Sequence, residues 1–530
     1  MISPRLAVAP WALVVCALAA APFAGCGSAD RCVAPSALTE PFRPRAHFAP
    51  ASGWMNDPNG LVYFGGEYHL FYQYNPDYPV PGEMHWGHAV SPDLVRWTQL
   101  PIALAPHSTL GVVFSGSAVI DARNTSGLCP EAGGCLAAVF THALGADHQQ
   151  KQSLAVSHDR GRTFVEYAQN PVLPNPGLPD FRDPKVFWHA PTSRWILILA
   201  AGPKALLYAS ADLRNWTELS SFGPLSSLPA GAWECPDLFS LTEEVSGRER
   251  WVLKLDVNPG AGRKGDGRYL VGSFDGTRFT ADAPEAPQTL DHGPDFYAAQ
   301  SFSGVAGRSV WVAWRDSWEY AYLTPSEGWR GAMTFPRELS LLPAAGGGSR
   351  LAQRPVREVD TLRASCTLAS LANTTVAAAA AALSGVAADA FDLELEATVD
   401  AGATLELEVL RGATERTLVG FDAARGVVYV DRTASGDVSF SPAFAGRFEA
   451  PYAAADGVLR WRLLVDRSSV ELFAGDGTTV LTASVYPSPT SRGLGLRVAG
   501  GSAAIRRFVL WPLQSAPIGG RSAAALQSSR

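Results

Sequence analysis

The chain has 530 residues, of which 47% are hydrophobic, 10% aromatic and 18% charged, and its formal net charge is −7. This length exceeds that of one ordinary domain, so we expect two domains with buried cores. The 50 glycines and 39 prolines, together with the aromatic share, favour a turn-rich, all-β protein. The negative charge without a basic cluster excludes nucleic acid as the expected partner.

The N-terminus has the pattern of a targeting segment. Arg5 precedes an apolar run, Leu6–Ala21, that is too short for a stable membrane span. The following Phe23-Ala24-Gly25-Cys26 resembles the cleavage box of bacterial lipoproteins, which predicts a signal peptide over residues 1–26 and lipidation of Cys26. Phe23 departs from the usual leucine, so cleavage without lipidation is the alternative. Both predict export: to the cell envelope through a lipid anchor, or otherwise to the periplasm or medium.

Seven cysteines occur, and five remain once the two in the targeting segment are removed, an odd number for an oxidising compartment. Cys129 and Cys135 bracket a short Pro/Gly loop, which predicts a local disulfide. The cysteines do not pair with histidines at zinc spacing, and the ten histidines are scattered. We therefore expect neither a metal nor a cofactor.

Residues 27–45 are rich in proline and alanine and are expected to form a tether. From 46 to 345, short apolar runs alternate with turns, which predicts strands. A degenerate Ser-x-Asp element followed by an aromatic residue recurs about every 60 residues, a period typical of propeller blades. Its copies begin at Ser91, Ser157, Ser210 and Ser273. Four copies and an unmatched stretch near 300–340 predict a five-bladed β-propeller.

A glycine-rich stretch at 346–348 marks the expected end of the propeller, and residues 346–372 are expected to form a linker. Alternating apolar and polar residues then begin at Phe391–Ala397 and recur in further short runs. Several half-buried strands at short spacing, without helices, predict a β-sandwich over residues 373–513. Residues 514–530 are expected to be a disordered tail.

Three acidic residues lie in similar stretches, each just before a proline. Asp57 precedes Pro58, Asp183 precedes Pro184, and Glu234 lies two residues before Pro236. Each stretch alone could be a turn. Their spacing, however, is about two repeats and one repeat, so equivalent positions on different blades would converge at the propeller axis. The pattern predicts an axial cluster of three acids.

Such a cluster suits the cleavage of a sugar. Breaking a glycosidic bond needs a carboxylate near the anomeric carbon and a protonated carboxyl beside the leaving oxygen. Neighbouring acids repel, so at least one pKa rises and supplies the proton. Arg182 is expected to keep Asp183 ionised, which leaves Glu234, between Trp233 and Cys235, as the candidate acid.

The same stretches resemble the three signature motifs of glycoside hydrolase family 32, which contains invertases, exo-inulinases and levanases. They are Trp-Met-Asn-Asp-Pro-Asn-Gly at 54–60, Phe-Arg-Asp-Pro at 181–184 and Glu-Cys-Pro at 234–236. Further matches, such as Trp329–Met333 and Asp466–Phe473, span most of the chain. The resemblance implies the same architecture, a five-bladed propeller followed by a β-sandwich.

The resemblance also implies roles. Asp57 would be the nucleophile that forms a covalent fructosyl-enzyme, Glu234 the general acid and then base, and Asp183 a stabiliser of the transition state. Retention of configuration predicts carboxyls of Asp57 and Glu234 about 5 Å apart. The residues implied in holding the terminal fructose are Asn56, Gln73, Trp86, Ser115 and Arg182, with Phe114 and Trp318 as pocket wall. Burial in a core is the alternative for both tryptophans. Cys235 is expected to be buried packing near the acid.

The substrate follows from a further segment. Trp314–Ala321 resembles the corresponding segment of exo-acting fructan hydrolases, but Arg315-Asp316-Ser317 departs from it and is expected to place a charge pair near the pocket rim. We therefore expect a retaining exo-β-fructosidase acting on levan or inulin, with sucrose as a side substrate. The alternatives are a fructosyltransferase, a non-catalytic surface fructan-binding protein and an inverting arabinan-cleaving propeller enzyme.

Overall fold

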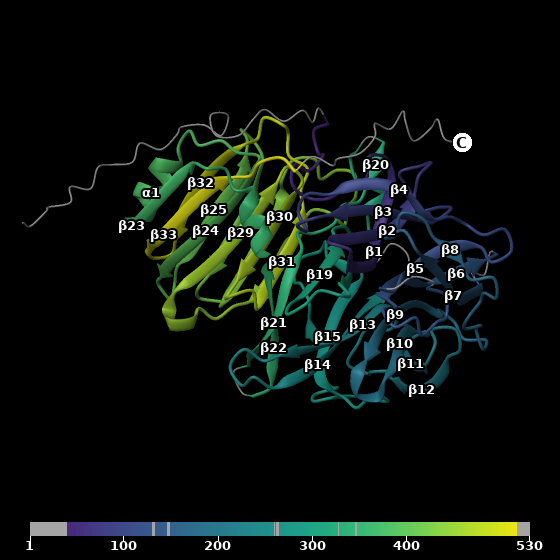
Figure 1. The fold of residues 1–530 in the computed structure, drawn as a ribbon. Helices are drawn as coiled ribbons and strands as arrows, with labels where there is room; N and C mark the ends of the chain where they lie inside the picture. Colours follow the sequence, from purple (N-terminus) through teal and green to yellow (C-terminus); the bar gives the residue numbers. More distant parts are fainter. Residues whose placement is uncertain are drawn as a thin grey trace, which may run out of the picture.

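The computed structural model describes residues 40–516 except 130–132, 146–148, 259, 261–263, 327 and 345–346. It contains two β-rich parts that lie side by side, a propeller and a sandwich (Figure 1). The predicted signal peptide, the lipidation site Cys26 and the tail beyond 516 lie outside the described residues. Among the described residues we find no helix long and apolar enough to span a bilayer.

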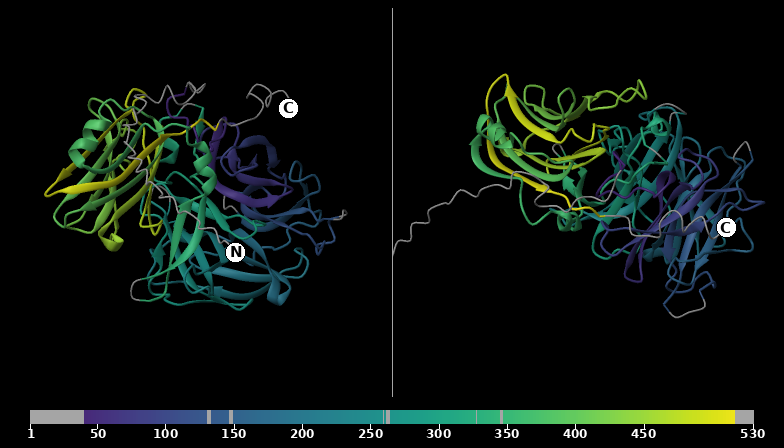
Figure 2. Two further views of the ribbon diagram at one scale, coloured as in Figure 1. Left: turned by 60° about the vertical axis from the view of Figure 1, so that its left-hand side comes forward. Right: turned by 90° about the horizontal axis from the view of Figure 1, so that it is seen from above.

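The propeller consists of five sheets arranged around an axis (Figure 2). In chain order the blades contain β1 (Gly53–Phe64), β2 (Glu67–Asn75), β3 (His85–Ser91) and β4 (Thr98–Leu104); β5 (Val112–Ile120), β6 (Leu136–Leu144), β7 (Gln149–Ser157) and β8 (Val165–Glu166); β9 (Arg182–His189), β10 (Arg194–Ala200), β11 (Ala205–Ser210) and β12 (Thr217–Phe222); β13 (Ala232–Thr242), β14 (Glu249–Asn258), β15 (Asp266–Phe274) and β16 (Phe279–Ala281); and β18 (Tyr297–Ser301), β19 (Ser309–Trp314), β21 (Arg337–Pro343) and β22 (Ser349–Pro355). The short β17 (Gln288–Thr289) pairs with β15, and β20 (Trp329–Arg330) pairs in parallel with β1. The prediction of five blades is confirmed.

The recurring Ser-x-Asp element is the turn after the third strand of a blade. Ser91, Ser157 and Ser210 end β3, β7 and β11, and each hydroxyl donates to the aspartate two residues later. These aspartates in turn accept backbone N–H groups of the turn, as in an Asx-turn. The repeat in the sequence therefore marks the turn that follows the third strand in successive blades.

The first strands of the blades form a closed ring around the axis. Contacts run from β1 to β5, β9, β13 and β18 and back to β1. Residues on these inner strands converge on one axial region although they lie far apart in the chain. The predicted convergence of equivalent positions is confirmed at the level of the strands.

The sandwich packs two antiparallel sheets over one apolar core. One sheet has the order β23–β33–β24–β29–β30–β31 and the other β28–β27–β26–β25–β32. Their bounds are β23 (Ala369–Thr375), β24 (Ala390–Val399), β25 (Thr404–Arg411), β26 (Arg416–Asp422), β27 (Val427–Ala434), β28 (Arg447–Pro451), β29 (Leu459–Asp466), β30 (Ser469–Ala474), β31 (Thr479–Ser484), β32 (Gly493–Ala499) and β33 (Ala503–Pro512). Short 3₁₀ turns cover Ala190–Thr192, Ala321–Leu323, Arg357–Leu362 and Ala455–Gly457.

The sandwich contains a helix that we did not expect. The alanine-rich run is α1 (Val376–Leu383), at the end of the sandwich away from the propeller (Figure 1). Alanine has the highest helix propensity, and the Thr375 hydroxyl caps the first turn by accepting from the N–H of Ala378. Val376, Ala379 and Leu383 are buried, so packing against the sheets completes the helix.

Several expected boundaries were wrong: β23 begins at Ala369, inside the expected linker, and Ala516, in the expected tail, is buried. Gly347 and Gly348 lie between the paired strands β21 and β22 and have the positive φ that tight turns need, so residues 349–355 belong to the fifth blade and not to a linker. The last residues of the expected tether, 41–45, are also packed. Arg43 is buried over the Trp329 ring, and Arg45 pairs with Asp389 of the sandwich.

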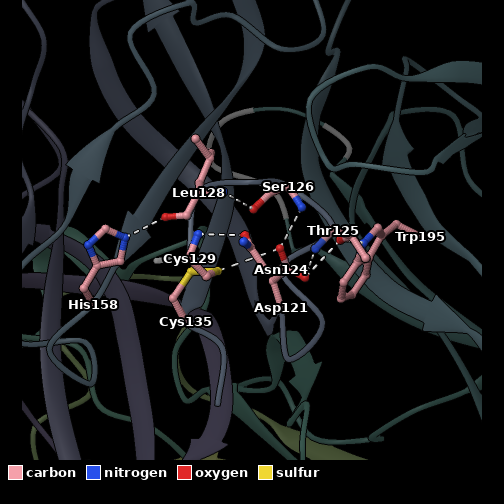
Figure 3. Close-up of a disulfide and its surroundings, with 9 residues drawn as sticks. All are labelled: Asp121, Asn124, Thr125, Ser126, Leu128, Cys129, Cys135, His158 and Trp195. Carbon is pink, nitrogen blue, oxygen red and sulfur yellow. Dashed lines mark hydrogen bonds between the residues drawn. A yellow bond between two sulfur atoms is a disulfide. The ribbon is translucent and has the colours of Figure 1, made fainter. Parts of the chain in front are cut away.

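The predicted disulfide between Cys129 and Cys135 is present in the loop between β5 and β6 (Figure 3). The buried Asp121 carboxylate organises the same loop by accepting the N–H groups of Thr125 and Ser126. Thr125 accepts a hydrogen bond from the Trp195 indole of the next blade, so the loop is tied to β10. The disulfide closes a loop that hydrogen bonds already fix to two blades.

Candidate active site

The inner strands are irregular at matching places near the axis. The pairing register shifts in β1 between Met55 and Pro58, in β5 between Val113 and Gly116, in β9 opposite Ile198 and Ala200, in β13 between Glu234 and Asp237, and in β18 between Tyr297 and Gln300. A proline cannot donate to a strand ladder, so Pro58, Pro184 and Pro236 disrupt the pairing and favour bulges. A bulge changes the direction in which nearby side chains point. The three predicted acids lie at three of these five bulges.

Backbone strain accompanies these bulges. Asp183, Cys235 and Ala298 have φ values of 61°, 48° and 55°, in the left-handed region that non-glycine residues rarely adopt. Such strain persists only where the surrounding structure holds it, and it is concentrated at functional sites. The three residues lie on three neighbouring inner strands, β9, β13 and β18.

A pocket of about 1040 Å³ opens at the axis above these bulges. Of the ten predicted catalytic and substrate-binding residues, nine line it: Asn56, Asp57, Gln73, Phe114, Ser115, Arg182, Asp183, Glu234 and Trp318. A second hollow of about 600 Å³ shares Arg182 and Trp318 with the pocket and continues past Asn258 and Tyr322. The Trp318 ring stacks on Trp54 with 5.9 Å between ring centroids, so it is fixed at the junction of the two hollows.

The prediction of Trp86 as a sugar-binding residue was wrong. Trp86 is fully buried among Phe71 and Phe140, and its indole N–H donates to the carbonyl of Phe114 at 3.0 Å. It lies one strand behind the pocket wall, on β3, where its ring fills the space between two blades. Trp86 supports Phe114 from the core.

Asp57 accepts hydrogen bonds on both carboxylate oxygens. Asn56 Nδ2 donates to Oδ1 at 3.0 Å, and the Ser115 hydroxyl donates to Oδ2 at 2.8 Å. The Cys235 thiol lies 3.4 Å from the same Oδ2. Burial and the nearby charge of Glu234 raise the pKa of Asp57, while the three donors oppose that rise. The donors orient the carboxylate and leave it facing the pocket.

Asp183 lines the pocket with only 7% of its surface exposed, and its Oδ2 accepts the N–H of Cys235 at 3.0 Å. Burial raises the pKa of Asp183 to about 7, against the opposing charge of Arg182. Arg182 does favour the ionised form of Asp183, as expected, but burial and the charges of Glu234 and Asp57 outweigh it. Arg182 directs Nη1 to Asp180 at 2.5 Å and Nη2 to Glu234 at 2.8 Å and lies 3.9 Å from Asp183, so it contacts Glu234 more closely than Asp183.

Glu234 is held by three donors from three strands. Arg182 reaches Oε1, Asn258 Nδ2 spans both oxygens at 3.1 and 3.2 Å, and the Tyr297 hydroxyl donates to Oε2. Asn258 and Tyr297 were missed from the sequence. Asn258 lies across the ladder on β14, and Tyr297 opens β18. Asn258 ends an Asp-x-Asn run and Tyr297 ends an Asp-Phe-Tyr run. Neither run contains the acid-proline pattern that revealed the three acids, so neither residue was singled out.

Cys235 lies where we expected it, and His88 also packs behind the pocket. Cys235 is buried, and its sulfur contacts both Asp57 and Asp183 at 3.4 and 3.7 Å. Burial, followed by the charges of these two acids, raises the pKa of the thiol well above its usual range, so it is a neutral spacer between carboxylates. His88 is buried and stacks on Phe71 behind the pocket.

The charge pair expected at the rim is instead buried. Arg315 and Asp316 are 4% and 3% exposed. Arg315 Nη1 donates to the carbonyl of Ser468 at 2.8 Å and to the Ser484 hydroxyl at 3.0 Å, both in the sandwich. Arg315 joins the two parts of the molecule, and neither residue lines the pocket.

The raised pKa of Asp183 makes a prediction about stability. An aspartate with a pKa near 7 when folded and 3.8 when unfolded stabilises the fold below about pH 4 and loses that contribution as the pH rises towards 7. Asp183→Asn removes the cost of ionising the buried group. We expect this variant to be about 1–3 kcal/mol more stable than wild type near pH 8, with a gain that vanishes near pH 4, in unfolding curves across this range.

Asp466→Asn is the control of opposite sign. Burial disfavours the Asp466 carboxylate, but hydrogen bonds from His47, Arg45 and Ala46 outweigh it and lower the pKa to about 2. Its contribution is therefore present above pH 4, and its loss should destabilise the protein at neutral pH. An Asp183→Asn variant that is also less stable near pH 8 would contradict the account of this site.

Comparisons with known proteins agree with the geometry. Residues 47–355 match the model of the glycosyl hydrolases family 32 N-terminal domain, and residues 358–512 match that of the family 32 C terminal domain. A levanase of Bacillus subtilis is 43% identical over 485 residues, covering 90% of this chain and 71% of that protein. The extracellular exo-inulinase inuE of Aspergillus ficuum is 38% identical, covering 85% of this chain and 90% of that protein.

Solved structures extend the likeness to the fold. The crystal structure of the exo-inulinase from Aspergillus awamori superposes with a TM-score of 0.83 at 35% identity, covering 90% of this chain and 99% of that one. Both family models, the sequence identity and the shared architecture lead to one conclusion. This chain belongs to glycoside hydrolase family 32.

Proposed function

We propose that the chain is a retaining exo-β-fructosidase that releases terminal fructose from levan or inulin and also cleaves sucrose. The observation that carries this proposal is the convergence of Asp57, Asp183 and Glu234 from three blades on one pocket. The similarity to a levanase and to exo-inulinases supports fructans as the substrate class. A disulfide and relatives named as extracellular support export, and lipidation of Cys26 stays a prediction.

The proposed reaction has two steps. In the first, an oxygen of Asp57 attacks the anomeric carbon of the terminal fructose while Glu234 gives a proton to the departing glycosidic oxygen, which leaves a fructosyl ester on Asp57. In the second, Glu234 takes a proton from water, whose oxygen attacks the same carbon and frees the Asp57 carboxylate. Two displacements at one carbon retain its configuration.

The contacts around each acid suit these steps. Asn56 and Ser115 fix Asp57 so that one face of the carboxylate can meet the sugar. Arg182, Asn258 and Tyr297 fix Glu234, which must both donate and accept a proton during the cycle. Asp183 is placed to bind sugar hydroxyls as charge develops on the ring. The separation of the two reacting carboxyls, about 5 Å for a retaining enzyme, stays a prediction.

Product analysis on levan, inulin and sucrose tests the proposal. We expect free fructose as the first and only early product from either polymer, and fructose with glucose from sucrose. Chromatography of samples taken over time measures these products. Short fructo-oligosaccharides as early products would contradict exo action, and longer chains built from sucrose would mean a fructosyltransferase. A wild-type protein that turns over none of the three would contradict the enzyme and leave a fructan-binding protein.

A further inference from the structure

The sandwich contacts the propeller through a loop that leads into the active site. Residues 290–296 lie along β31, the edge strand of the larger sheet. The N–H groups of His292 and Asp295 donate to the carbonyls of Val480 and Thr482, and the N–H of Ser484 donates to the Asp295 carboxylate at 2.7 Å. The loop therefore satisfies an edge that would otherwise be open.

The fit of this loop is close. A Cβ atom added to Gly293 would meet the Thr482 carbonyl oxygen at 2.0 Å, so the loop backbone lies directly on the strand. In Figure 1, β31 lies on the side of the sandwich that faces the propeller. The edge strand and the loop are fixed relative to each other at the level of the backbone.

A buried ion pair crosses the same interface. Arg432 on β27 directs Nη1 to Asp295 Oδ2 at 2.6 Å and Nη2 to the Tyr320 hydroxyl at 2.8 Å. Tyr320 in turn donates to Asp295 Oδ1, and all three residues are fully buried. The Arg432 guanidinium also lies 3.7 Å from the centre of the Phe444 ring. Removing one partner from such a cluster leaves an uncompensated buried charge and forces the neighbours to rearrange.

Both propeller partners of Arg432 are close in the chain to the pocket. Asp295 lies two residues before Tyr297, whose hydroxyl donates to Glu234. Tyr320 lies two residues after Trp318, the pocket-wall ring stacked on Trp54. A single sandwich side chain, Arg432, therefore holds both segments. One segment places the Tyr297 hydroxyl on Glu234, and the other places Trp318 in the pocket wall.

We propose that Arg432, with Asp295 and Tyr320, is a positioning residue for the reaction, so that the sandwich is a working part of the active site. The inference deepens the proposed function and rests on it. Catalytic groups must stay within about 0.5 Å of their productive positions, and a misplacement of about 1 Å can cost about 100-fold in rate. The cluster supplies this constraint for Tyr297 and, through it, for Glu234.

The test uses Tyr320→Phe and Arg432→Met in the full chain, assayed on sucrose for kcat and KM. Tyr320→Phe keeps the ring and removes one hydroxyl, so it also tests the proposal if Arg432→Met does not fold. We expect kcat to fall about 10-fold in Tyr320→Phe and further in Arg432→Met, with a smaller change in KM. In a protein that already carries Tyr297→Phe, Tyr320→Phe should lower kcat by a smaller factor than it does in the wild type, because both substitutions act on the hydrogen bond from Tyr297 to Glu234.

Arg363→Met is the matched control. Arg363 pairs with the fully buried Asp392 of the sandwich, with Glu394 and with Asp360, and its guanidinium lies over the Trp511 ring. None of these partners belongs to the 290–296 loop or to the Arg432 cluster. It should lose stability and keep wild-type kcat. If the wild type is active and Tyr320→Phe has an unchanged kcat, the inference is overturned but the proposed function stands. The same holds if the loss of kcat in the double variant equals the product of the losses in Tyr297→Phe and Tyr320→Phe. An inactive wild type would overturn the proposed function and the inference with it.

Discussion

Replacing Asp57 by asparagine is expected to lower kcat on sucrose or levan about 10⁴-fold or more while the protein stays folded. The amide cannot form an ester with the anomeric carbon, so the first displacement is lost and not merely slowed. Asn56 and Ser115 contact the carboxylate but do not replace it as a nucleophile. Initial rates and far-ultraviolet circular dichroism check both parts of this expectation.

Asp121→Asn is the matched control for that experiment. Asp121 is another aspartate of the propeller, fully buried away from the pocket, and it caps the disulfide loop through the N–H groups of Thr125 and Ser126. The variant should lose stability and retain kcat. An Asp57→Asn protein that keeps a tenth or more of wild-type activity would refute Asp57 as the nucleophile.

Glu234→Gln is expected to lower kcat on sucrose about 10²–10⁴-fold, the usual contribution of a general acid or base. Its amide oxygen can still accept from Arg182 and Asn258, and its amide nitrogen can donate to the Tyr297 hydroxyl, but the amide cannot give or take the proton that the reaction needs. With β-fructosyl fluoride, whose leaving group departs without a proton, the first step should recover. Added azide, which needs no base, should then accelerate the second step and yield fructosyl azide.

The pattern across substrates distinguishes this role from a structural one. If Glu234→Gln slowed the fluoride and sucrose equally, and azide had no effect, Glu234 would be needed for the shape of the pocket and not for proton transfer. Asn258→Ala serves as the comparison, because it removes one contact to Glu234 and leaves the carboxyl in place. It should show a smaller loss that azide does not relieve.

Much of this architecture was predictable because it depends on local, repeated chemistry. The Ser-x-Asp turns end the third strands of successive blades, and a proline follows each of the three acids where an inner strand bulges. Both signals arise from backbone hydrogen bonding within a few residues. Where they occur, they occupy equivalent places in different blades, which is why the spacing alone placed Asp57, Asp183 and Glu234 on one axis.

The errors concern contacts between distant segments. The sequence around Trp86 gives the ring no direction, and only the packing of two blades decides that it faces the core. Arg315 and Asp316 looked like a charge pair at the rim because they interrupt a segment that resembles that of exo-acting fructan hydrolases. The partners of Arg315, Ser468 and Ser484, lie in the other domain. Tyr297 likewise meets Glu234 only when the ring of inner strands closes.

The central claim, a covalent intermediate on Asp57, is tested most directly by trapping it. Glu234→Gln would be incubated with β-fructosyl fluoride, digested with a protease and analysed by mass spectrometry, beside the Asp57→Asn, Glu234→Gln double variant. We predict one fructosyl group on the peptide that contains Asp57, absent from the double variant and removed by azide. Turnover of the fluoride without any adduct, or an adduct on another residue, would contradict the account.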